Sequence, residues 1–365
     1  MTEPENDIDE VTQEIGRVFM GGDFIETPFD LPFEEETRGD PDQRDDDENF
    51  AETKLANNLE GIIKKDIKKT SYENKFKFFL DGSLRTKFLG EYVDRDNSFP
   101  ILAAEVSCAA LRKIDRNLRP ALLAWRLVFI FPHKDTGLLA DTQYQKLEQI
   151  GERLRKANSR FRIEFLRKEG VRDVRYSMQG KARDVMHTLE HEVANSLQRE
   201  EEEWLIMDGA IRKAEFLSLE NTIGVAKSFS RKPHFEVGGN TLNITRYLSQ
   251  IREGERSAIF RLESAHDVIF WYIRIRTFPP MEPLGGLVKV DFKLLNDTLT
   301  SDDIQLADEI SAEIYSIRNP SVYPYPRWPS FLYPIRVTEE TMSSMFLNEE
   351  MLGLYGHKLK QTIKE

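Results

Sequence analysis

The chain has 365 residues and carries 63 acidic against 51 basic side chains, which gives a formal net charge of −12 at pH 7. Its single cysteine, Cys108, excludes an internal disulfide framework and a multi-cysteine zinc site, and it favours a reducing cytoplasm. No apolar run reaches the roughly 18 residues of a membrane span, and the acidic N-terminus is unlike a signal peptide, so we expect a cytoplasmic protein without a membrane partner.

The acidic excess is concentrated at the N-terminus. Residues 1–50 hold 18 Asp and Glu against 3 Lys and Arg, a net −15, so residues 51–365 sum to +3. A segment so acidic buries too little apolar surface to offset its ordering entropy, so we predict a flexible segment at 1–50 and one folded domain at 51–365. The acidic segment is a solvated tail, a mimic of a polyanion or a ligand for a partner's basic face, with Val18-Phe19-Met20 and Phe29 to Phe33 as candidate anchors. The weakly basic remainder leaves a nucleic-acid partner open.

Helix and strand patterns then alternate along the chain. Residues 50–69 are predicted to form a helix with a basic end. Three strands follow, at residues 78–90, 100–111 and 121–131, and their short connections favour an antiparallel meander. The first of them contains Phe78-Phe79-Leu80-Asp81-Gly82-Ser83, in which an apolar run ends on Asp-Gly.

Residues 142–170 are predicted to be a helix and linking structure rich in cations. Between Gly151 and Arg183 there are 11 Lys and Arg against 4 Asp and Glu. Such a run is either a solvated face or a surface that contacts phosphates, with Lys156, Arg160 and Arg162 as candidates.

An amphipathic helix is predicted over residues 180–200, where apolar residues recur at four-residue spacing from Val185 to Leu197. It carries His187-Thr188-Leu189-Glu190-His191, which matches the H-x-x-E-H pattern of zinc peptidases and would let both histidines bind zinc from one face. Short patterns of this kind often arise by chance. The favoured alternative is that Glu190, or Glu192 on a neighbouring face, points a carboxylate toward the strand that follows.

That strand is Trp204-Leu205-Ile206-Met207, and it ends on Asp208-Gly209. An unpaired charge at the end of a buried strand costs several kcal/mol, on the order of 3–5 kcal/mol, unless a partner compensates it. Cation coordination is one such compensation, and the glycine permits close approach of backbone or ligand. The repeated Asp-Gly at Asp81 and Asp208 therefore predicts one metal site shared by two carboxylates.

The next strand, within Glu220–Ser228, ends on Lys227, which is either an ordinary strand-end cation or a phosphate contact. Later strands are predicted at residues 258–261, 269–276 and 286–292. Arg274 and Arg276 share one face of their strand, which suits contacts to anionic oxygens or a solvated surface.

Proline and aromatic residues dominate the segment Tyr323-Pro324-Tyr325-Pro326-Arg327-Trp328-Pro329, which predicts a loop. A helix is expected to follow from Val337 through Gly353, with Thr338 as its candidate N-cap.

Taken in order, these motifs resemble the NurA nuclease family. The resemblance rests on Asp81-Gly82-Ser83, on a helical glutamate before Leu205-Ile206-Met207-Asp208-Gly209, on Gly224-x-x-Lys227-Ser228, on the late Phe-x-x-Arg strand and on the Tyr-Pro-Tyr-Pro segment. It covers about Phe78 to Thr341, and no single motif in it is specific. It implies an α/β fold with an RNase H-like mixed sheet flanked by helices, in a ring-closing dimer. Residues 51–365 would then be a NurA-like nuclease domain.

The resemblance also implies manganese-dependent cutting of DNA, often from 5′ ends, alongside the hexameric translocase HerA, in DNA-end processing or defence against foreign DNA. Asp81 and Asp208 would be metal ligands, Glu190 the helical ligand with Glu192 as its substitute, and Lys227 the strand-end cation. Mn²⁺ or Mg²⁺ is the expected cofactor, since hard cations prefer oxygen ligands. Two cations roughly 3.5–4 Å apart would activate a water and stabilise the leaving oxygen. The expected DNA contacts are Arg85, Arg261, Arg274, Arg276, Lys156, Arg160 and Arg162.

One departure from the family pattern concerns the last helix. Members usually carry a metal-site histidine there, whereas this chain offers Glu339 and Glu340. Either glutamate would serve as an oxygen ligand, or the site is inactive and the chain is a noncatalytic partner of the motor. The chain has no GxxxxGK[ST] phosphate loop, so ATP-driven motion would come from a partner. A zinc peptidase using His187, Glu190 and His191 is the third alternative.

Overall fold

The computed structural model describes residues 4–27, 64–95, 97–166, 173–211, 214–229, 234–237, 240–261, 268–277, 283–294, 299–320, 330–347 and 349–365. Most of the helix predicted at residues 50–69 and the Tyr-Pro-Tyr-Pro segment lie outside these residues. Residues 65 and 66, at the end of that predicted helix, form a short strand instead.

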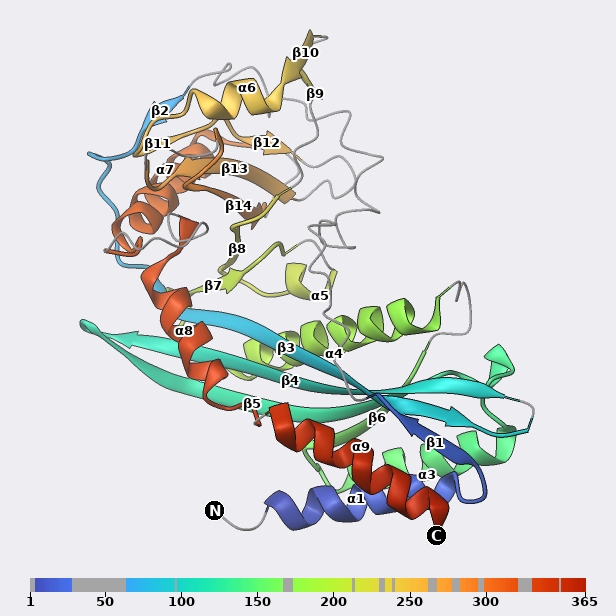
Figure 1. Ribbon diagram of the computed structural model, residues 1–365. Coiled ribbons are helices and arrows are strands. Elements are labelled where there is room, and N and C mark those ends of the chain that lie inside the picture. The colour runs from blue at the N-terminus through green and yellow to red at the C-terminus, as the bar shows by residue number, and fades with distance from the viewer. Residues whose placement is uncertain are drawn as a thin grey trace.

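In the described residues, twelve strands form one mixed sheet in the order β2-β11-β13-β14-β8-β7-β3-β4-β5-β6, with β1 added beside β3 and β12 beside β13 (Figure 1). These strands are β1 (Asp23–Glu26), β2 (Lys65–Asp66), β3 (Phe76–Val93), β4 (Ser98–Ile114), β5 (Asn117–Phe131), β6 (Phe161–Phe165), β7 (Trp204–Asp208), β8 (Thr222–Ala226), β11 (Glu255–Arg256), β12 (Phe260–Arg261), β13 (Val268–Arg274) and β14 (Leu287–Lys293). A separate hairpin pairs β9 (His234–Val237) with β10 (Asn240–Asn243).

The described helices flank the sheet. They are α1 (Pro4–Val18), α3 (Asp141–Lys156), α4 (Val174–Ser196), α5 (Ala214–Leu217), α6 (Ile244–Ser249), α7 (Ser301–Ser316), α8 (Tyr333–Ser343) and α9 (Glu349–Lys364), with a 3₁₀ turn at Lys134–Thr136. None of them is both long enough and apolar enough to cross a bilayer.

The central part of the sheet is the predicted meander. β3, β4 and β5 pair antiparallel, with Asp81 opposite Ala109 and Ala109 opposite Leu123. β3 then pairs in parallel with β7, and β7 pairs in parallel with β8. Across the sheet the strands lie in the order β5-β4-β3-β7-β8. Neighbours among the first three are antiparallel to each other, and β7 and β8 are parallel to β3. This is the RNase H-like arrangement. The expected α/β fold with a mixed sheet flanked by helices is confirmed.

The crossover from the meander to β7 runs through α4, which covers one face of β3 and β4 (Figure 1). Apolar residues at helical spacing line its inner side, among them Met178, Ala182, Val185 and Leu189. They pack against alternate residues of β4, such as Ala104 and Val106, because successive strand residues point to opposite faces. The opposite face of the meander packs against α1, α3 and α9.

The other end of the sheet forms its own core beneath α7. The Trp271 indole of β13 donates a 2.8 Å hydrogen bond to the Ser311 hydroxyl of α7. Arg256, fully buried, donates a 2.6 Å bond to the Asp308 carboxylate of the same helix. A buried guanidinium persists here because a carboxylate compensates its charge.

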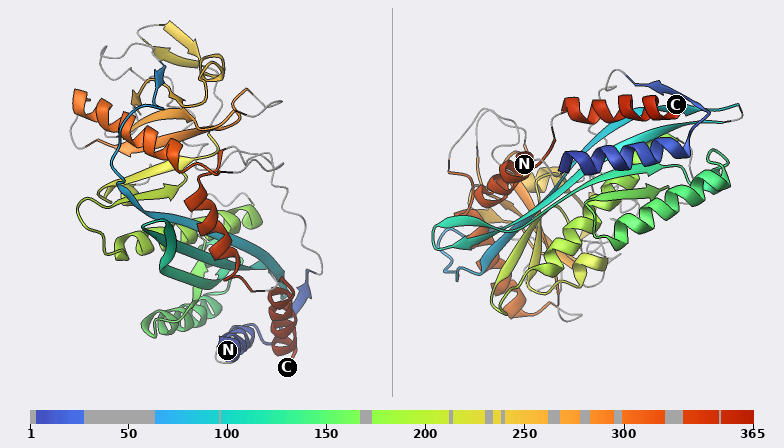
Figure 2. Two further views of the ribbon diagram at one scale, coloured as in Figure 1. Left: turned by 90° about the vertical axis from the view of Figure 1, so that its left-hand side faces the viewer. Right: turned by 90° about the horizontal axis from the view of Figure 1, so that it is seen from below.

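The N-terminal segment differs from the flexible segment predicted for residues 1–50. Within residues 4–27, α1 packs against α9 and α3, and β1 pairs antiparallel with β3 (Figure 2). Ile15, Phe19 and Phe24 are buried in the meander's core. A few well-spaced apolar residues therefore order this stretch despite its charge.

The last helix also differs from the prediction, because two helices, α8 and α9, stand where one was expected from Val337 to Gly353. α8 begins earlier, with Leu332 as its N-cap and Pro334 in its first turn, where proline loses no helical hydrogen bond. Thr338 is not the N-cap. It is buried inside α8, and its hydroxyl donates to the Pro334 carbonyl at 2.9 Å.

Candidate metal centre

The parallel pairing of β3 with β7 ends at the candidate centre, where β7 stops and β3 continues to Val93. Leu80 of β3 lies opposite Met207 of β7, so the next residue on each strand, Asp81 and Asp208, is an aspartate. At Gly209 the backbone takes a positive φ of 99°, which a side chain rarely tolerates, and the chain leaves the sheet. The two aspartates, far apart in sequence, are therefore brought together as expected.

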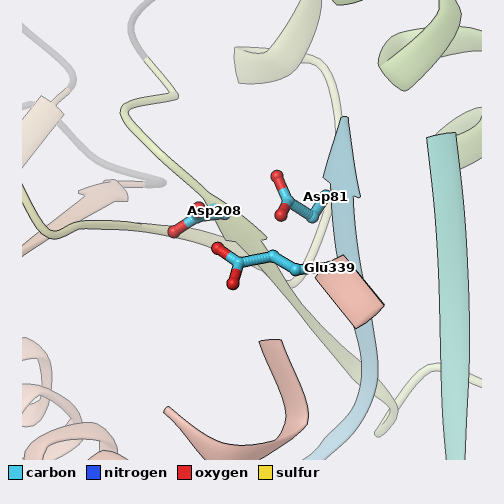
Figure 3. Close-up of side chains that lie close together, drawn as sticks. All are labelled: Asp81, Asp208 and Glu339. Atoms are coloured by element: carbon cyan, nitrogen blue, oxygen red, sulfur yellow. The ribbon is translucent and has the colours of Figure 1, made fainter. Parts of the chain in front are cut away.

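Helix α8 supplies a third carboxylate. It packs against β3 and β4 and directs Glu339 toward Asp81 and Asp208 (Figure 3). One carboxylate oxygen each from Asp81, Asp208 and Glu339 lies within 4.8 Å of the others. We call these residues the carboxylate triad. Three hard oxygen donors at this separation fit a divalent cation such as Mn²⁺ or Mg²⁺.

Lys227 closes the triad from β8. It follows Ala226 at the end of that strand, and its ammonium lies 2.9 Å from Asp208 Oδ2 and 2.6 Å from Glu339 Oε1. The same ammonium lies 4.1 Å from the ring centre of Phe331, a cation–π distance. Burial acts to lower the pKa of Lys227, but the carboxylates of Asp208 and Glu339 outweigh it and raise that pKa. Lys227 is therefore a fixed positive charge in the centre.

Burial, with mutual repulsion as a smaller contribution, raises the pKa values of two carboxylates of the triad. Burial, followed by the charge of Asp208, raises the pKa of Asp81 well above its ordinary value, although Lys227 opposes this. Burial also raises the pKa of Glu339, again against the effect of Lys227. One lysine thus only partly compensates three clustered carboxylates, and a bound cation would relieve the remaining repulsion.

Glu190 approaches β3 beside Asp81 from the opposite face of the sheet. A Cβ placed on Gly82 would lie 2.2 Å from Glu190 Oε1, so the glutamate of α4 packs directly on this glycine. Asp81, one residue earlier, alternates to the face on which α8 lies. Glu190 still contributes to the raised pKa of Asp81, but it stands beside the triad and is not part of it. Its carboxylate lies 2.9 Å from His187 Nδ1.

Two other expected ligands point elsewhere. Glu192 pairs with Arg126 on the exposed side of α4, because it lies two residues from Glu190 on a helix and faces away. Glu340 pairs with Arg336 at 2.8 Å on the outer side of α8. Neither belongs to the triad.

The zinc-peptidase arrangement is not assembled in the described residues. His187 contacts Glu190, whereas the amide of Asn195 lies 3.0 Å from His191 Nε2. The metal-suited group found among the described residues is the carboxylate triad.

The structure corrects the expectation that Arg274 contacts DNA. Its side chain is buried, and it donates to the backbone carbonyls of Ile251 at 2.5 Å, Pro283 at 2.8 Å and Leu248 at 3.2 Å, so it ties loops to the end of β13. Arg276 is half-buried and donates to the Asn319 carbonyl at 2.5 Å. Arg261 belongs to β12, and its side chain lies outside the described residues.

The remaining predicted DNA contacts lie near the surface. Lys156 and Arg160 are exposed, at the end of α3 and just before β6, and Arg162 on β6 is half-buried among other arginines. β6 itself was not predicted, although Phe161, Ile163 and Phe165 alternate with one arginine and one glutamate, because the cation-rich stretch around it was interpreted as helix and linking structure. Arg85 stacks 4.5 Å from the ring centre of Phe346, beside the connection between α8 and α9.

Sequence reasoning missed Phe331, and it named Glu339 only as a replacement for a family histidine. The available signal for Phe331 was an aromatic residue directly before Leu332 and the start of α8. Nothing in the local sequence connects it with Lys227, more than one hundred residues earlier.

No protein-family model matches the sequence. A search of curated protein sequences also finds no match. Among solved structures, the chain is similar to the NurA nuclease from Sulfolobus solfataricus, with 12% identity, a TM-score of 0.35, and coverage of 80% of this chain and 87% of that one. It is also similar to endonuclease V from Bacillus subtilis, with 11% identity, a TM-score of 0.33, and coverage of 76% and 83%. Endonuclease V from Ciona intestinalis, in complex with DNA containing an inosine followed by a ribo-adenosine, matches with 11% identity, a TM-score of 0.31, and coverage of 84% and 95%. These structural neighbours are nucleases, and scores this low assign the chain to none of their families.

Proposed function

We propose that this chain is a cytoplasmic, divalent-metal-dependent DNA nuclease that hydrolyses phosphodiester bonds. The observation that carries the proposal is the convergence of Asp81 of β3, Asp208 of β7 and Glu339 of α8, which each bring one carboxylate oxygen within 4.8 Å of the others. Elements this rigid hold ligands in place, as metal-assisted hydrolysis requires. We assign the function to the domain of residues 51–365, against which α1 and β1 pack.

Each residue of the centre has a defined part in this proposal. Asp81, Asp208 and Glu339 would hold the cation, which would supply Lewis-acid activation of water and neutralise charge on the phosphate. Lys227 holds a permanent positive charge beside them, suited to a phosphate oxygen or a developing negative charge. Glu190 adds negative charge from the other face and strengthens the demand for a cation.

The DNA backbone would lie on cationic surface outside the centre. Lys156 and Arg160 are exposed, and Arg162 lies close to Arg126 and Arg155. Such residues contact phosphates without reading sequence. Arg85 and Arg276 are further candidates whose side chains are half-buried.

Two aspartate variants test the proposal. Asp81→Asn and Asp208→Asn nearly preserve shape but remove a ligand charge, so cleavage of linear DNA in Mn²⁺ should fall on the order of 100-fold or more, at least the effect of losing an outer-shell partner. Glu152→Gln, an exposed carboxylate on α3, is the matched control and should cut normally. Circular dichroism confirms that the variants fold.

The finer proposals concern partners. The motif resemblance supports a homodimer that works with a HerA-like hexameric ATPase, in DNA-end processing or defence. Adding such an ATPase and ATP to the same assay should accelerate cutting by the wild type.

One observation favours a noncatalytic subunit as the second candidate. Lys227 already bonds two of the three carboxylates, so the cluster is partly neutralised by the chain itself. A folded wild type that cuts no DNA in Mn²⁺ or Mg²⁺, with the motor present, would establish this alternative and refute the nuclease.

A further inference from the structure

Lys227 has the contacts of a cation bound at the centre. Its ammonium bridges Asp208 and Glu339, at 2.9 and 2.6 Å, and these are two of the three residues suited to hold a metal. An ammonium between two carboxylates neutralises them as a second metal ion would, but it cannot dissociate because the backbone tethers it.

The lysine is held in this position from several sides. Its side chain is only 13% exposed, and Phe331 covers the ammonium at 4.1 Å. Ala226, the residue before it, belongs to β8, which is paired to β14 on one side and β7 on the other. Withdrawing Lys227 would break two charge-assisted contacts inside a largely buried cluster.

Charge balance favours a single metal ion beside the lysine. The ionised triad carries three negative charges and Lys227 one positive charge, which leaves a net −2. One divalent cation neutralises that charge. A second would compete with Lys227 for Asp208 and Glu339.

We infer that Lys227 takes the place of the second metal ion, so that the centre binds one divalent cation per chain. This inference rests on the proposed metal site and replaces the two-cation arrangement expected from sequence. The catalytic apparatus would then consist of one exchangeable ion and one built-in cation. The lysine would serve both to neutralise the carboxylates and to exclude a second ion.

Manganese binding to the full-length protein tests this inference without an activity assay. Isothermal titration with Mn²⁺ should give one ion per wild-type chain, and the electron paramagnetic resonance spectrum at saturation should be that of an isolated Mn²⁺ ion. Lys227→Met removes the charge at similar length, so a second ion should enter and produce the spectrum of a coupled pair. Lys113→Met, an exposed lysine that contacts Asn74, should behave like the wild type. A double variant with Asp81→Asn and Asp208→Asn measures the background Mn²⁺ binding outside the centre.

Three results would overturn the inference. They are two ions or a coupled spectrum in the wild type, an unchanged stoichiometry of one in folded Lys227→Met, and no binding above background. If Lys227→Met does not fold, the wild-type spectrum still decides, and Lys227→Arg, which keeps the charge, should retain a single ion. One bound ion without DNA cleavage would support the single-ion inference and refute the proposed nuclease function. DNA cleavage by a wild type that shows a coupled Mn²⁺ pair would support the nuclease function and refute the single-ion inference.

Discussion

At the scale of single residues, two glycines determine how closely the elements around the carboxylates can approach one another. Gly82 has no side chain between β3 and α4, and Glu190 occupies that space. Gly224 plays a similar part on β8, where a Cβ would lie 2.5 Å from the Gly209 carbonyl oxygen. The chain that follows Asp208 can pass close to β8 only because Gly224 has no side chain. Two glycines thus allow close approaches around the centre that any other residue would obstruct.

Gly82→Ala should displace Glu190 and disturb Asp81. The new methyl would meet the glutamate carboxylate at 2.2 Å, so either the side chain or the helix must shift. We expect a loss of stability of about 1–3 kcal/mol, typical of overpacking, together with weaker Mn²⁺ binding. Chemical denaturation and Mn²⁺ titration measure the two effects.

Gly180→Ala is the matched control for this substitution. It lies in α4 with nothing within 4 Å of its added Cβ, so the protein should be as stable as the wild type or more stable by up to about 1 kcal/mol. Equal behaviour of the two variants would contradict the packing of Glu190 on Gly82.

At the scale of elements, the connection between α8 and α9 is tied to the sheet by a buried carboxylate. Glu105 of β4 accepts a 2.9 Å hydrogen bond from the Leu347 amide and a 3.2 Å bond from the Trp125 indole. Its partner across the strand pair, Arg85, lies over Phe346. Because α8 carries Glu339, this tie helps to fix where the third carboxylate of the triad stands.

The tie should make stability depend on pH. Burial raises the pKa of Glu105, although the bonds from Leu347 and Trp125 act against it. A folded-state pKa above the unfolded one means a contribution to stability that is present below the unfolded value and is lost as pH rises through the folded value. Glu105→Gln keeps an acceptor oxygen without the charge. Its free energy of unfolding relative to the wild type should therefore increase as the pH rises above about 4, near the unfolded pKa of a glutamate.

Urea titrations at several pH values measure this difference. Glu152→Gln, whose carboxylate is exposed on α3, should show a difference that does not change with pH. A pH-independent difference for Glu105→Gln would show that the carboxylate is not strained by burial.

At the scale of the whole molecule, the two ends of the chain form one layer beneath the meander. α1 and α9 lie side by side in Figure 2, and both contribute to the core on that face of the sheet. Lys358 of α9 pairs with Asp9 of α1. The N-terminal helix is thus part of the folded body, and the acidic charge around it does not prevent its packing.

If the N-terminal helix is part of the folded body, Phe19→Ala should lower the free energy of unfolding. The ring is fully buried and lies 4.9 Å from the ring of Tyr92 and 5.8 Å from that of Phe131, measured between centres. Its loss should cost about 3–5 kcal/mol and lower the melting temperature. Met20→Ala, whose side chain is 53% exposed, should change stability by less than about 0.5 kcal/mol. A tail independent of the core would give the same small effect for both.

Much of the architecture could be predicted from the sequence because its signals are local. Alternating or continuous apolar runs identified β3, β4, β5, β7 and β8, and a four-residue apolar spacing identified α4. The pairing of Asp81 with Asp208 followed from the same logic, since both runs end on Asp-Gly. Errors arose where packing overrode composition, as in α1, or where a five-residue strand lay within a stretch rich in cations, as in β6.

The sequence by itself determined which carboxylates follow buried apolar runs and which cation follows the next strand, because strand periodicity and the charge that ends an apolar run are properties of a few consecutive residues. Only the tertiary structure decided that Glu339 joins these carboxylates, that Glu192 and Arg274 turn away from any ligand, and that Lys227 stands between Asp208 and Glu339. These outcomes depend on the face from which each helix crosses the sheet and on the space that Gly82 and Gly224 leave open. Contacts between residues more than one hundred positions apart leave no trace in local patterns.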